Sequence, residues 1–364
     1  MTMLSHWSLL DLLVRNWAIV TFAATIAALV LVPSLVVLKY VRISLNIMRS
    51  TKPPLARSPL DFERMHGQPV TFSAYDGLPL SGMLFRASAS VERRGMIVFA
   101  HEYCADMHSC ARYCRPLQEI GYDIFAFDFR GHGQSDCQPG YTPRQWISNH
   151  DMADMRGAVA FVEEWLERNG LPRRFGVFGI SRGAAAAILA ASENDNIQAI
   201  VSDGGFSTDK TIEYFMRRWA YIFARIRIVP ETEHQAFWPF LRWCLMSRAR
   251  REFGCSFPSV RKALRSMRPR PMLFIHGEKD SYLPVEQTRL LYALAPQPKH
   301  LWIAPNARHN QAVALHPETY AGLTAWFFDR YLAGRQVVKS ASAPAAAVVT
   351  APLVVSPAAS AAGA

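Results

Sequence analysis

Short apolar runs alternate with longer segments of mixed polarity through most of the chain. They read GMIVFAH, DIFAFDF, FGVFGI, AIVSDG, PMLFIHG and HLWIAP, and begin at Gly95, Asp123, Phe175, Ala199, Pro271 and His300. Near-continuous apolar character is typical of strands buried on both faces. Helix-length segments between such strands indicate a mostly parallel central sheet flanked by helices. The pattern therefore predicts an α/β fold.

A hairpin is expected upstream of these runs, at one edge of the sheet. The stretch VTFSAYDGLPLSGMLF contains two segments of alternating polarity, separated by Asp76 and Gly77. An Asp-Gly pair at such a junction favours the tight turn between two antiparallel strands.

The N-terminal region differs from the rest because residues 17–38 contain no charged side chain. As a helix this stretch would be about 33 Å long, enough to cross a hydrocarbon core of about 30 Å. A cleavable signal peptide has a shorter apolar region. Only Arg15 precedes the stretch closely, whereas Lys39, Arg42 and Arg49 follow it. We therefore expect residues 1–58 to form a single-pass membrane anchor with a basic linker, and the body to lie in the cytoplasm.

The positive charge of the chain is concentrated in one segment. The whole chain carries 40 Lys and Arg against 29 Asp and Glu, whereas residues 208–270 alone carry 14 against 5. This segment interrupts the strand pattern, is rich in aromatic residues and predicts a helical insertion. Its basic, aromatic stretches favour contact with an anionic membrane surface. The alternative is a basic face exposed to solvent above an apolar underside. Binding to nucleic acid is not expected, because no nucleic-acid-binding motif accompanies the charge.

The cysteines of the chain bear on disulfide formation and on metal binding. Six cysteines in a chain of 364 residues need not form disulfides, and free thiols suit a cytoplasmic body. Cys104, His108, Cys110 and Cys114 cluster, but no second pair with zinc-like spacing follows, so no metal site is expected.

Residues 337–364 are rich in Ala, Pro, Ser and Val, which predicts a disordered tail.

The candidate chemistry begins with GISRG, at Gly179 to Gly183. A G-x-S-x-G motif between a strand and a helix is typical of a nucleophile elbow, although Ser181 alone would also suit a helix N-cap. A serine hydroxyl needs a base, and the base needs an orienting carboxylate. Asp280 and His309 follow two successive predicted strands, in the order Ser, Asp, His. Each alone could be an ordinary loop residue, but together they predict a catalytic triad.

With these motifs, residues 60–332 resemble the α/β-hydrolase superfamily. DFRGHGQSD and HGEKDSYLP are similar to loops of its esterases and monoacylglycerol lipases. The layout is most similar to the membrane-anchored Bem46 and monoacylglycerol-lipase-like group, of serine aminopeptidase S33 type. The resemblance implies an α/β-hydrolase domain over residues 59–336 with a helical cap near residues 208–270, and no metal or organic cofactor. A serine at the elbow argues against the haloalkane dehalogenases and epoxide hydrolases, which use aspartate.

The resemblance also implies an oxyanion hole, formed by the backbone N–H groups of Arg182 and of Tyr103, with Cys104 as the adjacent possibility. Relatives usually have His-Gly where this chain has His101 and Glu102. Glu102 would add bulk and negative charge, which would weaken catalysis or select a cationic substrate. We expect His101, Glu102 and Cys104 to border the substrate.

Two ambiguities remain open from the sequence. The side chain of Arg182 would either enter the pocket and bind an anion or lie on a helix surface. His101 and Asp106 also match the H-x(4)-D pattern of glycerolipid acyltransferases, but the predicted strand and triad already account for these residues.

The sequence thus predicts a membrane-anchored serine hydrolase of carboxylic esters, acting on an acyl lipid or another hydrophobic ester. A peptidase, amidase or thioesterase would use the same residues. A membrane-tethered scaffold with weak activity is the alternative from another class, and Glu102 favours it. Oligomeric state and acyl-chain length have no signal in the sequence.

Overall fold

The computed structural model describes residues 16–50, 63–223 and 236–335. The chain divides into two compact units, one of residues 1–50 and 216–249 and the other of residues 51–215 and 250–364. Residues 39–50 of the predicted basic linker are described and are helical, whereas residues 51–58 and the predicted C-terminal tail lie outside the described residues.

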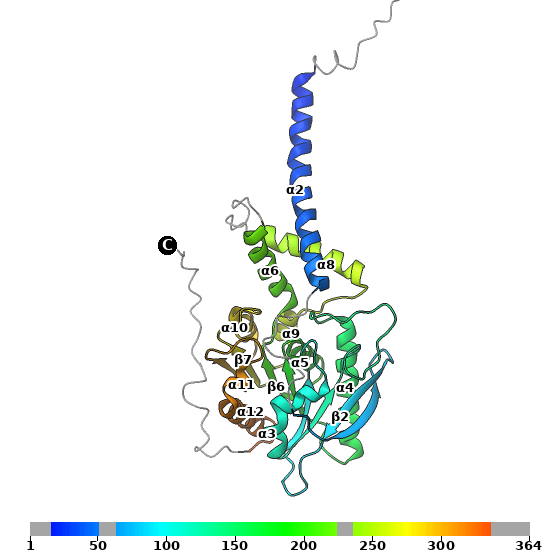
Figure 1. The fold of residues 1–364 in the computed structure, drawn as a ribbon, viewed down its shortest axis with the longest axis vertical. Coiled ribbons are helices and arrows are strands. Elements are labelled where there is room, and N and C mark those ends of the chain that lie inside the picture. The colour runs from blue at the N-terminus through cyan, green and yellow to red at the C-terminus, as the bar shows by residue number, and fades with distance from the viewer. Residues whose placement is uncertain (1–15, 51–62, 224–235, 336–364) are drawn as a thin grey trace, which may run out of the picture. The chain divides into compact units, whose positions relative to one another are not determined.

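The larger unit is built on one eight-stranded sheet with the strand order β1-β2-β4-β3-β5-β6-β7-β8 (Figure 1). Strands β1 and β2 run antiparallel, β2 is antiparallel to β4, and the neighbours from β4 to β8 are parallel. The strands are β1 (Gln68–Ser73), β2 (Pro79–Phe85), β3 (Gly95–Ala100), β4 (Tyr122–Phe127), β5 (Phe175–Ile180), β6 (Ile197–Asp203), β7 (Met272–Gly277) and β8 (Lys299–Ala304). The predicted runs and the edge hairpin are confirmed.

Helices cover both faces of this sheet, as Figure 1 shows. One hydrophobic cluster joins the sheet to α4 (Asn149–Arg168), α5 (Arg182–Glu193), α9 (Val260–Ser266) and α10 (Val285–Leu294). The other joins it to the 3-10 turn η1 (Met107–Ser109) and to α3 (Cys110–Glu119), α11 (Ala312–Leu315) and α12 (Pro317–Tyr331). Strands β4, β5 and β7 are buried along their whole length, as expected for strands covered on both faces.

The register of the parallel strands brings several loops to one edge of the sheet. Ala100 at the end of β3 pairs with Gly179 in β5, and Ile180 at the end of β5 pairs with Asp203 at the end of β6. In open α/β sheets, this carboxyl edge is where ligands bind.

The smaller unit contains α2 (Trp17–Ser50), most of α8 (Phe237–Phe253) and the end of α6 (Thr208–Phe223), which begins in the larger unit. Among the described residues, one helix is long and apolar enough to cross a membrane, over Trp17–Arg49 with a mean hydropathy of 2.4. Toward its C-terminal end, one side of α2 is buried, at Val41, Ser44, Leu45 and Met48. The predicted insertion of residues 208–270 covers α6, α8 and α9, but α9 packs into the core of the larger unit.

Candidate active site

Ser181 occupies a sharp turn between β5 and α5. Its φ of 52° and ψ of −111° lie in a region that non-glycine residues rarely adopt. A Cβ on Gly183 would lie 2.0 Å from the carbonyl oxygen of Ala100, so α5 approaches β3 too closely for any side chain there. The hydroxyl of Ser181 makes no cap hydrogen bond with α5. Ser181 therefore occupies the N-cap position of α5 without capping the helix through its side chain, and the hydroxyl is left for other partners.

Ser181, His309 and Asp280, which the order of motifs along the chain predicts as a triad, are linked by two consecutive hydrogen bonds. Ser181 Oγ is 2.9 Å from His309 Nε2, and His309 Nδ1 is 2.6 Å from Asp280 Oδ2. A carboxylate only accepts hydrogen bonds, so Nδ1 carries the proton and Nε2 is left to accept one from the serine. All three residues are buried, with exposed fractions of 7 to 9%. This arrangement can transfer a proton from the hydroxyl to the imidazole.

The carboxylate of Asp280 is held by more than His309. Its Oδ1 accepts the backbone N–H groups of Tyr282 and Leu283, at 2.9 and 2.8 Å. Burial by itself raises the pKa of Asp280, but the adjacent His309 and these hydrogen bonds outweigh it, so the pKa is lowered overall. Asp280 therefore remains ionised when the site is assembled.

A second imidazole, which the sequence analysis did not single out, borders the same carboxylate. His276 at the end of β7 is buried, with Nε2 at 2.8 Å from the carbonyl oxygen of Leu283 and 3.4 Å from Asp280 Oδ2. Its Nδ1 lies 2.8 Å from Thr288 Oγ1. Burial lowers the pKa of His276, which favours the neutral ring that donates from Nε2. His276 thus ties the loop that carries Asp280 to α10.

The candidate oxyanion hole lies beside Ser181. Within the part of the chain that the structure describes, neither the backbone N–H of Tyr103 nor that of Arg182 donates to a protein acceptor. Two free donors next to a nucleophile are what a developing oxyanion requires. Cys104, the adjacent possibility, has a φ of 64° and an exposed side chain.

The side chain of Arg182 neither enters the pocket nor reaches the surface. It is fully buried, and its Nη1 lies 3.1 Å from the carbonyl oxygen of Arg144 and 3.2 Å from Asp151 Oδ1. The guanidinium carbon also lies 4.7 Å from the ring centre of Phe129. Arg182 therefore pairs with a carboxylate of the protein itself, and neither expectation for its side chain is met.

His101 and Glu102 differ in their relation to the cavity at Ser181: Glu102 is among its lining residues, and His101 is not. His101 is fully buried and uses both ring nitrogens, Nδ1 with the carbonyl oxygen of Glu102 and Nε2 with the N–H of Phe129. The carboxyl group of Glu102 accepts the hydroxyls of Tyr113 at 3.1 Å and Ser109 at 3.3 Å. Burial raises the pKa of Glu102. Glu102 is accommodated by α3 and its preceding turn, which place hydroxyl donors opposite its carboxyl group.

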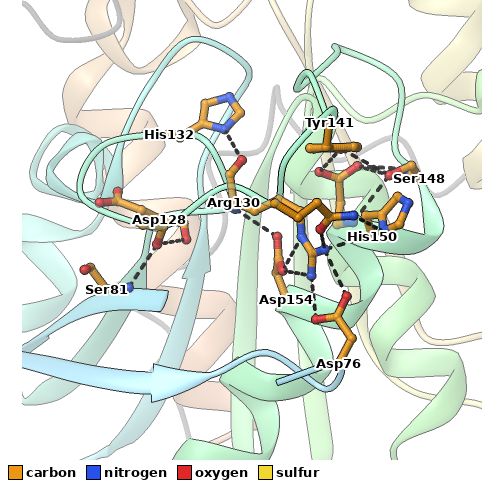
Figure 2. Close-up of polar contacts among 12 residues, drawn as sticks. Asp76, Ser81, Asp128, Arg130, His132, Tyr141, Ser148, His150 and Asp154 are labelled. Atoms are coloured by element: carbon orange, nitrogen blue, oxygen red, sulfur yellow. Dashed lines mark hydrogen bonds and ion pairs between the residues drawn. The ribbon is translucent and has the colours of Figure 1, made fainter. Parts of the chain in front are cut away.

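The loop after β4 is fixed by a second polar network (Figure 2). The buried guanidinium of Arg130 lies 2.6 Å from Asp154 on α4 and 2.9 Å from Asp76 in the hairpin turn. Asp128 accepts the N–H groups of Met107 and Gln134, at 2.6 and 2.8 Å. The motif that begins at Asp128 is therefore structural, because it joins the hairpin, α4 and the loop after β3.

Eight residues line a small cavity at Ser181. Its volume is about 10 Å³. The lining residues are Glu102, Tyr103, Gln145, Ser181, Phe206, Tyr282, His309 and Asn310. Gln145, Phe206, Tyr282 and Asn310 had no signal in the sequence, because each is a single residue in a loop. Among the described residues, no group of three or more His, Cys, Asp or Glu side chains could hold a metal ion.

Comparisons with known proteins agree with this architecture. The family model described as serine aminopeptidase, S33, matches residues 91–234. The YfhR protein of Escherichia coli is 25% identical over 256 residues, which are 69% of this chain and 76% of YfhR. Protein bem46 of Schizosaccharomyces pombe is 23% identical over 264 residues, covering 70% of this chain and 74% of bem46.

Solved structures share the fold. The esterase Pf2001 of Pyrococcus furiosus superposes with a TM-score of 0.53 at 24% identity, covering 77% of this chain and 100% of the esterase. The α/β hydrolase GrgF of Penicillium sp. sh18 gives a TM-score of 0.52 at 20% identity, covering 74% of this chain and 100% of GrgF.

Proposed function

Because this chain belongs to the α/β-hydrolase superfamily, we propose that it is a membrane-anchored serine hydrolase that cleaves carboxylic esters. The hydrogen-bonded line of Ser181, His309 and Asp280 supports this function most directly. The two free backbone donors beside it supply the second requirement of acyl transfer, stabilisation of the oxyanion.

The proposed reaction begins when Ser181 Oγ attacks the ester carbonyl and its proton passes to His309 Nε2. Asp280 holds the imidazole and stabilises the positive charge that it gains. The N–H groups of Tyr103 and Arg182 bind the oxyanion, each contributing about 3 kcal/mol in the transition state. His309 then protonates the leaving alcohol, and water releases the acyl group from Ser181 by the same steps.

The substrate is proposed to be a hydrophobic ester, such as an acyl lipid. Phe206, Tyr282 and Tyr103 give the wall of the cavity an aromatic character. The apolar helix α2 supports anchoring in a membrane, close to such substrates. The positive residues that follow its apolar stretch favour a cytoplasmic catalytic domain. Exposed Phe240 and Trp243 on the basic helix α8 support an additional contact with the membrane surface.

Hydrolysis of a peptide or amide is the second candidate, because the matching family model is that of serine aminopeptidases. The same nucleophile and base would serve, so only the relative rates distinguish the two functions.

The test compares substrates on the full-length protein in detergent. We expect p-nitrophenyl esters to be hydrolysed faster than aminoacyl p-nitroanilides, and Ser181→Ala to abolish both reactions. Ser192→Ala on the same helix is the control, because its hydroxyl bonds the carbonyl oxygen of Leu189 within α5. Faster cleavage of the anilides would instead support hydrolysis of amides as the function of this protein. A folded wild-type protein that cleaves neither would support the scaffold.

A further inference from the structure

Two buried amide groups beside the candidate nucleophile lack a partner for their oxygen atoms. Gln145 and Asn310 are 5% and 8% exposed, and both line the cavity that contains Ser181 and His309. Gln145 Oε1 and Asn310 Oδ1 accept no hydrogen bond within the described part of the chain. Leaving a buried acceptor unsatisfied costs about 1–3 kcal/mol, so such atoms normally have a donor. The cavity is where that donor would bind.

The position of Gln145 is coupled to the nucleophile. It follows Arg144, whose carbonyl oxygen accepts a hydrogen bond from Nη1 of Arg182. Arg182 is the residue after Ser181. Three residues later Ser148 caps α4 through reciprocal hydrogen bonds with Asp151, which also pairs with Arg182. The loop that carries Gln145 is therefore fixed on both sides by contacts that lead back to the elbow.

Asn310 is placed in a similar way beside the base. It follows His309 and has a φ of 55°, a left-handed conformation in which Asn is tolerated better than most residues. An added Cβ on Gly204 would lie 3.1 Å from Asn310 Oδ1 and 3.3 Å from His309 Cε1. The amide oxygen and the Cε1 side of the imidazole thus face the same point of the loop after β6.

The size of the cavity indicates which molecule could donate hydrogen bonds to the two amide oxygens. About 10 Å³ is at the lower limit of what one water molecule needs, and a buried water usually has two to four polar partners. Ser181, His309, Gln145 and Asn310 supply such partners. We propose that Gln145 and Asn310 are positioning residues that hold the hydrolytic water of the deacylation step. This inference rests on the proposed serine hydrolase function.

In that step the acyl group is esterified to Ser181 Oγ. One proton of the water passes to His309 Nε2 as the water oxygen attacks the acyl carbon, and the carbonyl becomes the oxyanion. The second O–H of the water remains intact and donates to Gln145 Oε1 or Asn310 Oδ1. When the bond from the acyl carbon to Oγ breaks, His309 returns the proton to Oγ. The products are a carboxylic acid and free Ser181.

Methanol tests this role because it has only one O–H group. When methanol replaces water, that proton goes to His309 and none is left for the amide oxygens. Removing an acceptor should therefore slow hydrolysis of the acyl-enzyme but not its methanolysis. The full-length protein in detergent is given p-nitrophenyl acetate with added methanol, and the ratio of acetate to methyl acetate is measured.

Two substitutions remove the amide oxygens while suiting the side-chain length or backbone conformation at each position. Gln145→Met keeps the side-chain length without the acceptor, and Asn310→Gly removes the side chain at a left-handed position that glycine adopts freely. Each should lower the acetate to methyl acetate ratio by roughly five- to tenfold, the worth of one hydrogen bond. Asn310→Asp retains an acceptor and should keep the ratio within about twofold of wild type. Gln287→Met is the matched control, because Gln287 is 6% exposed and bonds Thr211 away from the cavity.

An unchanged ratio in both folded variants would overturn the inference. A parallel loss of hydrolysis and methanolysis would also overturn it, because the two amides would then bind the substrate. Melting temperatures identify a variant that fails to fold, and the two positions serve as independent tests. Failure of the proposed function itself looks different, because the wild-type protein would then release no p-nitrophenol.

Discussion

The guanidinium of Arg182 lies 3.2 Å from the carboxylate of Asp151, and neither side chain is exposed to solvent. Asp151 also closes the capping box at the start of α4, where its Oδ2 accepts the N–H and hydroxyl of Ser148. The residue that follows the candidate nucleophile is therefore bonded to the N-terminus of a neighbouring helix. This contact fixes the elbow from its buried side.

Arg182→Met tests the structural role of this pair. Breaking a buried ion pair leaves an uncompensated charge and costs about 3–5 kcal/mol. For a domain of this size, that corresponds to a decrease of roughly 10 °C in melting temperature. The comparison variant is Arg156→Met, because Arg156 and Glu193 form an ion pair whose members are 40% and 42% exposed. That exposed pair should be worth at most about 1 kcal/mol. Equal melting temperatures for the two variants would contradict this account.

His276 is predicted to act through Asp280. His276→Leu removes the Nε2 donor to the carbonyl oxygen of Leu283 and the ring edge 3.4 Å from the carboxylate of Asp280, which should lower kcat by about tenfold to a hundredfold by misplacing the imidazole of His309. His276→Gln retains an amide N–H and should restore most of the activity. A lower kcat that His276→Gln does not restore would indicate packing alone.

Asp203 makes stability depend on pH. Burial raises its pKa to about 7, although the hydroxyl of Tyr320 donates to it. In the unfolded chain an aspartate titrates near 3.9, so from about pH 4 to pH 7 the folded state binds more protons and stability falls as pH rises. Asp203→Asn mimics the neutral form. It should raise the melting temperature at pH 8 and change it little at pH 5.

The control for that measurement is Asp329→Asn. Asp329 pairs with Arg94 at 2.7 Å, so its neutral form should bring no gain in melting temperature at pH 8. A similar gain for both variants, or no gain for Asp203→Asn, would argue against the assignment.

Glu102→Gln should leave activity nearly intact. Glu102 lines the cavity, but its carboxyl group accepts the hydroxyls of Tyr113 and Ser109, and burial raises its pKa, which favours the neutral form. We expect kcat/KM for neutral and cationic esters to change by less than about threefold, since one hydrogen bond of neutral groups is exchanged for another. A selective loss of cationic esters would instead mean that Glu102 contacts the substrate.

The sequence predicted the sheet because burial on both faces requires uninterrupted apolar runs, such as FGVFGI at β5. It also placed Ser181, Asp280 and His309, because the motif and the order of these residues along strands are local properties of the chain. The direction of a buried polar side chain is not local. Glu102 is one such case, because the direction of its carboxyl group depends on Tyr113, eleven residues away in α3.

Several polar contacts had no signal in the sequence for the same reason. Asp151 and Arg182 are 31 residues apart, and Arg130 and Asp76 are 54 apart. Gln145 and Asn310 are single amides in loops, and only their common cavity relates them to the nucleophile. Such pairs are set by the packing of the whole domain, which no short pattern of residues encodes.

The central claim is that His309 activates Ser181 as the nucleophile. Full-length protein in detergent is treated with a fluorophosphonate, and the modified peptide is identified by mass spectrometry. We predict a single adduct on Ser181, absent from Ser181→Ala and formed at least about a hundredfold more slowly in His309→Ala, because an unassisted serine hydroxyl is a poor nucleophile. An adduct on another serine, or equal labelling of Ser181 without His309, would contradict the account.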